Sequence, residues 1–175
     1  MFLAAKAMDP TRPVLDAGGY SHRVFETDVF DTHDYEQDPR KFKAKHAATA
    51  QGKPFFHPNP DARGNRPEIW SLPYNGQPFF VSEFGGIWWN PDAKPGEASW
   101  GYGDRPKSLE EFFTRFEGLC AALLDDPSMF GYCYTQLTDV FQEQNGIYRF
   151  DRSGKFDMKR IRAAQVRPAA IEQSR

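Results

Sequence analysis

A glutamate placed directly after an apolar run is the residue of this sequence best suited to chemistry. Glu83 follows residues 78–82 (PFFVS) and precedes residues 84–86 (FGG). A buried strand fixes its backbone, so a carboxylate at its end is held in a defined position. Cleavage of a glycosidic bond uses two carboxyl groups, one to attack the anomeric carbon or activate water and one to protonate the leaving oxygen. The pattern alone is equally consistent with a glutamate that ends a strand in solvent and has no catalytic role.

Other hydrogen-bonding and aromatic side chains stand where further apolar runs end. Functional groups of a parallel α/β barrel gather at the carboxyl ends of its strands. Carboxylates and amides bind hydroxyl groups, and flat rings cover the apolar faces of a sugar, so such a set suits a polyhydroxylated ligand. The candidates are Asp16, Asp31, His33, Tyr35, Glu83, Tyr134, Gln136 and Asp139, with Trp88, Trp89 and Trp100 in a Gly- and Pro-rich loop.

The apolar runs and the breaks between them predict the elements that position these side chains. Strands are expected at residues 14–18, 28–31, 78–82 and 129–137, with a short extended piece at 147–150. Helices are expected at 39–50, 108–124 and 156–165, and residues 1–8 are expected to be the end of a helix. Residues 108–111 (SLEE) form a capping box. Strands separated by helical connections indicate a parallel α/β sheet.

Composition and charge exclude several classes of protein. The 175-residue chain has a net charge of -2, without the basic footprint of a nucleic-acid binder. No apolar run is long enough for a helix to span a membrane. Cys120 and Cys133 are expected to be buried free thiols rather than a disulfide framework. No ligand cluster surrounds His33, so no metal site is expected, and no cofactor is implied.

Four segments resemble family 2 glycoside hydrolases, the β-galactosidase and β-glucuronidase group, in the same order along the chain. Residues 79–86 (FFVSEFGG) resemble the nucleophile segment on strand seven of that family. Residues 9–14 (DPTRPV) resemble the entry to strand five, and residues 28–35 (DVFDTHDY) resemble strand six. Residues 131–139 (GYCYTQLTD) and 143–148 (EQNGIY) resemble strand eight and the loop after it. The resemblance extends from residue 1 to about residue 165.

The resemblance implies the C-terminal half, strands five to eight, of a (β/α)8 barrel and a retaining mechanism. Glu83 would form the glycosyl-enzyme intermediate. The acid/base would be the glutamate of an Asn-Glu pair after strand four, which would precede residue 1, and the sequence contains no such pair. The chain is therefore expected to begin within a domain and to be inactive alone. Residues 1–167 would be the half-barrel, and residues 168–175 a disordered tail.

The resemblance also implies roles for the other candidates. His33 and Tyr35 would contact the sugar held by the enzyme, Tyr134 would stack on it, and Trp88 and Trp100 would wall its subsites. Gln136 and Asp139 would position the loop after strand eight. Structural roles stay open for these residues: core packing for Tyr134, a turn for Asp139, and packing against the barrel for one tryptophan. Glucuronidases carry Asn-x-Lys where residues 143–145 are EQN, which favours a neutral, galactose-like sugar.

Two other classes stay open beside the retaining hydrolase. A noncatalytic carbohydrate-binding or structural module would keep the barrel segment without the chemistry, and an upstream Asn-Glu pair would distinguish the enzyme from it. An inverting hydrolase would hold its carboxyl groups further apart. The expected partner is a carbohydrate, and the two open sheet edges of a half-barrel are expected to cause self-association. The sequence does not indicate a cellular compartment.

Overall fold

The computed structural model describes residues 1–56, 71–94 and 96–173. Along this part of the chain the elements are α1 (Phe2–Met8), β1 (Phe30–Asp34), α2 (Pro39–His46), the 3-10 helix η1 (Thr49–Gln51), β2 (Phe79–Gly85), α3 (Leu109–Leu124), β3 (Met129–Thr135), α4 (Met158–Ala163) and α5 (Ala170–Gln173). Residues 57–70, between the helix predicted at 39–50 and the strand predicted at 78–82, lie outside the described residues.

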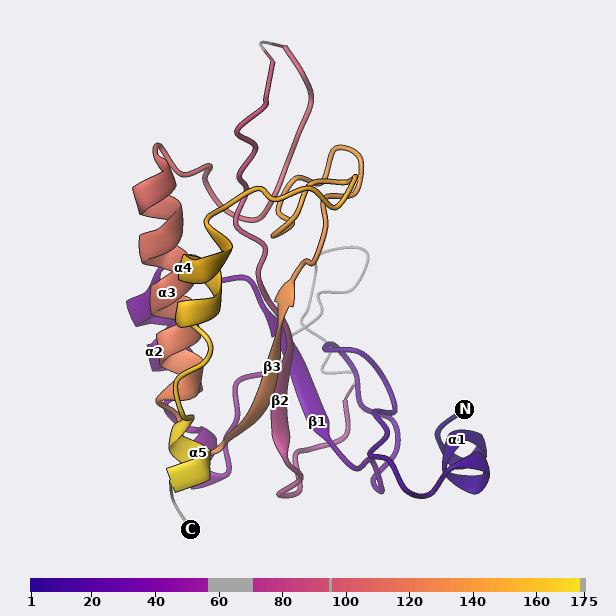
Figure 1. Ribbon diagram of the computed structural model, residues 1–175. Helices are drawn as coiled ribbons and strands as arrows, with labels where there is room; N and C mark the ends of the chain where they lie inside the picture. The colour runs from indigo at the N-terminus through magenta and orange to yellow at the C-terminus, as the bar shows by residue number, and fades with distance from the viewer. Residues whose placement is uncertain (57–70, 95, 174–175) are drawn as a thin grey trace, which may run out of the picture.

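The strands of the described residues form one small parallel sheet in the order β1-β2-β3. Helices α2, α3 and α4 lie on one side of this sheet, and the segment that contains α1 lies on the other side (Figure 1). The loops that follow β2 and β3 rise together beyond the carboxyl ends of the strands (Figure 1). This arrangement confirms a mixed α/β fold with a parallel sheet, which brings the ends of neighbouring strands to one edge.

The sheet contains irregularities that decide which way its side chains face. The register slips between Val81 and Phe84 where β2 pairs with β3, and between Phe79 and Phe80 where Phe130 of β3 is left without an opposite residue. An extra residue of this kind is a β-bulge, and it reverses the alternation of the side chains that follow. Both bulges affect the candidate site.

The helices begin where the sequence predicts, because polar side chains cap their first turns. Ser108 Oγ accepts a hydrogen bond from the Glu111 amide at 3.1 Å at the start of α3. Asp38 caps α2 and Asp157 caps α4 in the same way. The helix α2 is shorter than expected, because it ends at His46 and η1 replaces its predicted last turn.

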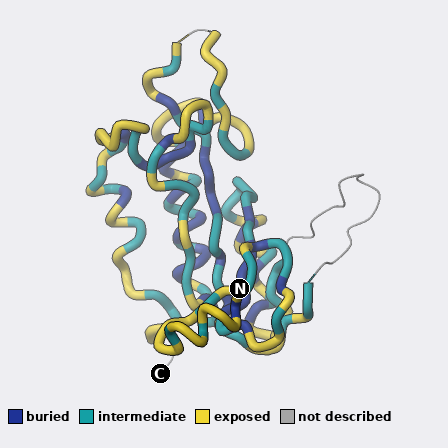
Figure 2. The backbone as a smooth tube through the Cα atoms, turned by 90° about the vertical axis from the view of Figure 1, so that its right-hand side faces the viewer, coloured by how far each residue is buried: buried dark blue, intermediate teal, exposed yellow. Residues whose placement is uncertain are grey.

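The core lies between the helices and the sheet, and the central strand is buried along most of its length (Figure 2). Phe116 of α3 lies 5.2 Å from Tyr134 of β3, and Phe42 of α2 lies 6.1 Å from Phe84 of β2. Each fully buried apolar side chain contributes about 1.5–3 kcal/mol. The largest fully buried side chains of this core are Phe42, Phe79, Phe84, Ile87, Phe112, Phe116, Leu119 and Leu123. The core therefore anchors β2 firmly just before Glu83.

The strand predicted at residues 14–18 is wrong. These residues form a loop with bends at 16–18, where the Asp28 carboxylate accepts a hydrogen bond from the Val14 amide at 2.8 Å and none of the described strands pairs with them. Residues 147–150 make isolated bridges, in which Tyr148 contacts Thr138 and Gly154. The described residues thus contain three strands, and four strands of a half-barrel are not seen among them.

Three further expectations can be compared with the structure. Cys120 is a buried free thiol, as predicted, and burial raises its pKa to about 12. Cys133 is free but exposed, so its predicted burial is wrong, because β3 turns it away from the helices. Residues 170–173, expected to be without order, form the helical turn α5. None of the helices in the described part of the chain is long and apolar enough to cross a membrane.

Candidate active site

The Glu83 carboxylate stands near the end of β2, with 43% of its side chain exposed. Its Oε2 atom accepts a hydrogen bond from the Tyr35 hydroxyl and lies 3.3 Å from Nδ1 of His33. Strict alternation would turn Glu83 to the same side as Val81, which is fully buried under the helices. The bulge between Val81 and Phe84 instead buries Phe84 and turns Glu83 to the open side.

Tyr35 connects Glu83 to the third strand and to the loop after β2. Its hydroxyl also lies 3.4 Å from Oγ1 of Thr135 at the end of β3, and its ring stacks on Tyr102 with 3.5 Å between centroids and 5° between planes. Burial raises the pKa of Tyr35, and the hydrogen bond to Glu83 raises it further. The hydroxyl therefore stays protonated and donates to the Glu83 carboxylate.

The His33 imidazole lies between the backbone of Gly19 and the ring of Tyr20. Gly19 has a φ of 65°, and a Cβ atom there would collide with the His33 imidazole, so only glycine fits without rearrangement. The Tyr20 ring meets the imidazole edge-on at 4.6 Å. Tyr20 and Tyr102 are not among the residues predicted from sequence, although each adjoins glycine, in GGY at 18–20 and GYG at 101–103.

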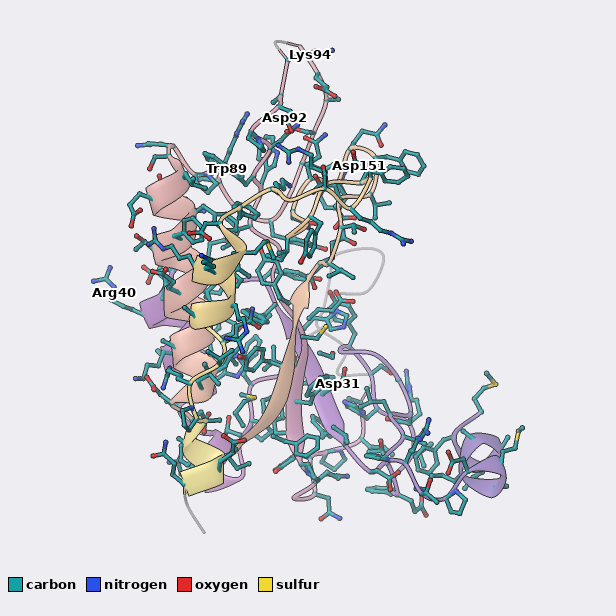
Figure 3. The ribbon with its side chains drawn as sticks, viewed as in Figure 1. Asp31, Arg40, Trp89, Asp92, Lys94 and Asp151 are labelled. Atoms are coloured by element: carbon teal, nitrogen blue, oxygen red, sulfur yellow. The ribbon has the colours of Figure 1, made fainter. Side chains whose placement is uncertain are left out.

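Asp16 and Asp31, both predicted site residues, belong to a buried cluster beside β1. Nδ1 of His22 lies 2.7 Å from Asp16 Oδ1, and Nε2 lies 3.0 Å from the Asp31 carbonyl oxygen. Asp31 also accepts hydrogen bonds from the Gly19 amide and the Ser82 hydroxyl. Figure 3 shows Asp31 on the side of β1 where this N-terminal segment lies.

The charge of this cluster is fixed by its hydrogen bonds. Burial lowers the pKa of His22, but the bonds to Asp31 and Asp16 outweigh it and raise the pKa to about 9. A protonated His22 therefore joins the two carboxylates at neutral pH. Both carboxylates are engaged in this structural role, so neither is available as a second acid at the Glu83 site.

The three tryptophans occupy different surroundings. Trp89 packs 6.4 Å from the ring of Phe112 beside the start of α3 (Figure 3). Trp88 donates from Nε1 to Ser99 Oγ at 3.1 Å within its own loop. Trp100 is 45% exposed and meets Tyr102 edge-on at 5.9 Å. Trp100 thus extends the aromatic surface that begins at Tyr35, and Trp89 is the one that packs against the core.

Tyr134, predicted to stack on the sugar, lies between the core and the groove that adjoins Glu83. Its ring lies among core rings, 5.5 Å from Phe84 and 5.2 Å from Phe116, and its hydroxyl accepts a hydrogen bond from the Ile87 amide. The bulge at Phe130 shifts the alternation of β3, which turns Tyr134 toward the helices and Cys133 toward solvent. The ring therefore packs against the core, the alternative left open by the sequence, and a sugar-stacking role for Tyr134 stays a prediction.

Gln136 and Asp139 organise the loop that follows β3. Asp139 is buried, and its Oδ1 accepts hydrogen bonds from the Gly146 amide at 2.9 Å and from Lys155 Nζ at 2.6 Å. Gln136 Nε2 donates to Asn145 Oδ1 at 2.9 Å. Both residues position the loop, and the structure gives Asp139 the turn-stabilising role that was an alternative from sequence.

A groove with a volume of about 510 Å³ adjoins Glu83 at the outer edge of β3. This volume falls within the range of small-molecule sites, about 300–1,000 Å³. Polar and apolar groups share its lining, which includes Ser82, Glu83, Gln136, Leu137, Ile147 and Ile161. In the part of the chain that the structure describes, no three His, Cys, Asp or Glu side chains are placed to hold a metal ion.

The comparisons with known proteins support the fold. No protein-family model matches the chain, and no curated protein matches it. The structure is similar to a GH2 β-galacturonidase from Eisenbergiella tayi, solved with glycerol and with galacturonate, at 17% identity and a TM-score of 0.56. The match covers 93% of this chain and 28% of that one. A β-glucuronidase from Faecalibacterium prausnitzii matches at 15% identity and a TM-score of 0.48, over 82% of this chain and 22% of that one.

The likeness to the Eisenbergiella tayi enzyme gives the class of fold. At 17% identity, similarity to the Eisenbergiella tayi enzyme shows a GH2-like α/β arrangement. It does not assign the roles of that enzyme's residues to residues of this chain. The chain spans 28% of the length of that enzyme.

Proposed function

We propose that the chain forms part of the (β/α)8 catalytic domain of a retaining glycoside hydrolase, with Glu83 as the nucleophile. The observation that carries the proposal is a half-exposed carboxylate at the carboxyl end of a parallel strand, fixed by two neighbouring side chains. Catalytic groups of α/β barrels lie at this end of their strands. The GH2-like fold favours glycoside hydrolysis as the reaction. The position of Glu83 supports it as the nucleophile.

In the proposed reaction an oxygen of Glu83 attacks the anomeric carbon of the sugar. The bond from that carbon to the leaving oxygen breaks, and the electron pair stays on the leaving oxygen, which takes a proton from a general acid. The product of this step is a glycosyl ester of Glu83, which water then hydrolyses. The general acid would be a glutamate of the whole protein outside these 175 residues, because no Asn-Glu pair occurs in them.

The neighbours of Glu83 have positioning and binding roles in this proposal. Tyr35 donates to the carboxylate and His33 lies within 3.3 Å of it, so both hold the attacking oxygen in place. Tyr102 and Trp100 continue an aromatic surface away from Tyr35, and an exposed ring of this kind can cover the apolar face of a sugar.

The loop after β3 favours a neutral sugar over a uronic acid. Glu143 brings a negative charge to this loop and accepts a hydrogen bond from Asn145 at 3.1 Å. Lys155 lies beneath the same loop, but Asp139 neutralises it at 2.6 Å and its side chain is fully buried. A sugar carboxylate beside Glu143 would meet a like charge, and Lys155 is already paired with Asp139. We therefore propose a galactose-like substrate.

The experiment that tests the proposal uses an activated, fluorinated substrate. A 2,4-dinitrophenyl 2-deoxy-2-fluoro-β-galactoside needs no proton on its leaving group, so the general acid is not required for the first step. We expect release of one dinitrophenolate per chain and a glycosylated peptide that contains Glu83. Glu83→Gln should release none. The corresponding galacturonide should react more slowly.

Two results would decide against the proposal. A label on another residue would remove Glu83 from the nucleophile role. Saturable binding of the galactoside without any dinitrophenolate release, in the chain and in the whole protein that contains it, would favour a noncatalytic carbohydrate-binding module.

A further inference from the structure

The buried Asp31 carboxylate is joined to two segments that flank the Glu83 site. Its Oδ2 atom accepts a hydrogen bond from the Gly19 amide at 3.0 Å and another from the Ser82 hydroxyl. Ser82 is the residue that precedes Glu83 in β2. Asp31 is fully buried, which keeps water from competing for its carboxylate oxygens. One oxygen atom therefore holds a loop residue and the strand that carries the candidate nucleophile.

Gly19 connects this carboxylate to the His33 imidazole. A Cβ atom at Gly19 would lie 2.0 Å from Cδ2 of His33, so the glycine backbone lies directly against the ring. Tyr20, the next residue, meets the same ring edge-on at 4.6 Å. The hydrogen bond from Gly19 to Asp31 thus fixes the two residues that enclose the imidazole. A shift of this loop would move His33, whose Nδ1 atom lies 3.3 Å from Oε2 of Glu83.

The position of the Asp31 carboxylate is fixed in turn by His22. Nε2 of His22 lies 3.3 Å from Oδ1 of Asp31 and 3.0 Å from its carbonyl oxygen, and Nδ1 lies 2.7 Å from Asp16. The imidazole stacks on the Phe30 ring with 4.0 Å between centroids. A charged imidazole between two buried carboxylates offsets the cost of taking them out of water. Without this charge, Oδ1 of Asp31 would lose its ion-pair partner.

We propose that the buried His22–Asp31 pair is a positioning unit for the reaction at Glu83. The pair acts through Gly19, which it holds against the His33 imidazole. Reacting groups must be held within about 0.5 Å of their productive position by side chains that further hydrogen bonds lock in place. This inference rests on the proposed function, because it concerns the reactivity of Glu83 as a nucleophile.

The first test is a double-mutant cycle in the assay of dinitrophenolate release. His22→Gln keeps a hydrogen-bonding side chain but removes the charge, and it should lower the release rate at saturating galactoside by roughly 10-fold. The galactoside concentration that gives half the maximal rate should change by less than about 2-fold, because the sugar contacts are unaltered. His33→Ala should also lower the maximal rate. If His22 acts through His33, adding His22→Gln to His33→Ala should lower it no further.

His46→Gln is the matched control for this cycle. His46 is another buried histidine, 3% exposed, and its Nε2 atom lies 3.2 Å from Oδ2 of Asp34 in the same strand, β1. Its ring packs beside Phe42 and Phe79 in the core, away from His33. His46→Gln should therefore lower the free energy of unfolding and leave the release rate unchanged. An equal loss of rate in His22→Gln and His46→Gln would overturn the proposal, because lost stability would explain both.

A second measurement does not depend on the activity of Glu83. The contact between the Tyr20 and His33 rings should give a nuclear Overhauser effect between their carbon-bound protons. The effect should weaken in His22→Gln and remain in His46→Gln. A rise in pH from 7 to 10 removes the same charge without a substitution, since the pKa of His22 is about 9, and should weaken the effect as well. Burial raises the pKa of Tyr20, so its own ring stays neutral over most of this range.

The possible failures of this inference and of the proposed function can be told apart. A ring contact that stays unchanged in His22→Gln and at pH 10 would overturn the inference alone. Rate losses that add in the double variant would also overturn it, because His22 would then not act through His33. The absence of any label on Glu83 in the unaltered protein would instead overturn the proposed function.

Discussion

The hydroxyl of Tyr35 donates a hydrogen bond to Glu83, and the ring that carries this hydroxyl lies flat against Tyr102, 3.5 Å away. Tyr35 follows β1, Glu83 is in β2 and Tyr102 is in the loop after β2. One contact surface therefore links the candidate nucleophile to a loop twenty residues further along the chain. Disturbing any of the three residues should change the reactivity of the carboxylate.

Removal of the Tyr35 hydroxyl is the most direct perturbation. A hydrogen bond to a charged group contributes about 1.5–3 kcal/mol, so Tyr35→Phe should slow dinitrophenolate release by roughly 10- to 100-fold. Tyr132→Phe is the control, because Tyr132 packs against Phe84 on the helix side, and its rate should be unchanged. Equal rates for Tyr35→Phe and the unaltered protein would show that the hydroxyl does not act on Glu83.

The stack between Tyr102 and Tyr35 should have a smaller effect. Such aromatic pairs contribute about 0.5–1.5 kcal/mol beyond the area that they bury. Tyr102→Leu should therefore slow the same release by roughly 2- to 10-fold. Tyr102→Phe keeps the stacked ring and should react at the normal rate. If Phe and Leu slow the reaction equally, the Tyr102 hydroxyl rather than the stack is responsible.

The close approach of Gly19 to His33 predicts a loss of stability on substitution. Gly19→Ala introduces a Cβ against the imidazole at a φ of 65°, and we expect a loss of about 1–3 kcal/mol in the free energy of unfolding, measured with urea. Gly18→Ala is a matched control one residue away, because nothing lies within 4 Å of a Cβ there. Similar unfolding curves for the two variants would contradict the described packing.

The buried His22 predicts a pH dependence of stability. Its pKa is raised from 6.5 to about 9, so the folded chain binds a proton that the unfolded chain releases sooner. The stabilisation, about 3 kcal/mol, is fully present below pH 6.5 and is lost as the pH rises through 9. Urea unfolding between pH 6 and pH 10 should show this decline.

A variant isolates the contribution of His22 from other groups that titrate in this range. In His22→Gln the side chain can still hydrogen bond but carries no charge, so the decline between pH 6.5 and 9 should become much shallower. Asp16 and Asp31 face His22 directly and would keep their negative charges in the variant. A decline as steep as that of the unaltered protein would place the titrating group elsewhere.

Several features could be predicted from sequence because short-range patterns encode them. Ser108 and the apolar spacing after it define α3, since a cap and a helical repeat act within a few residues. The apolar run before Glu83 predicts β2 for the same reason. The parallel order of the sheet follows from the helical connections, and the structure confirms it.

Other features depended on partners far away in the chain. Residues 14–18 have the composition of a strand, yet the Asp28 side chain takes the Val14 amide and they remain a loop. Tyr102 and Tyr35 are more than sixty residues apart in the sequence, and no local pattern predicts their contact. The contact of His22 with the Asp31 carbonyl oxygen could not be predicted from sequence either, because it depends on how the loop before β1 folds back.

The sequence by itself determined that an apolar strand ends at Glu83 within a parallel α/β fold. Only the tertiary structure decided which way the side chains face, because a single extra residue in a strand reverses every side chain that follows it. One bulge turns Glu83 toward Tyr35, and another buries Tyr134 and exposes Cys133. Bulges form where neighbouring strands fit together, so the orientation of a side chain is a property of the assembled sheet.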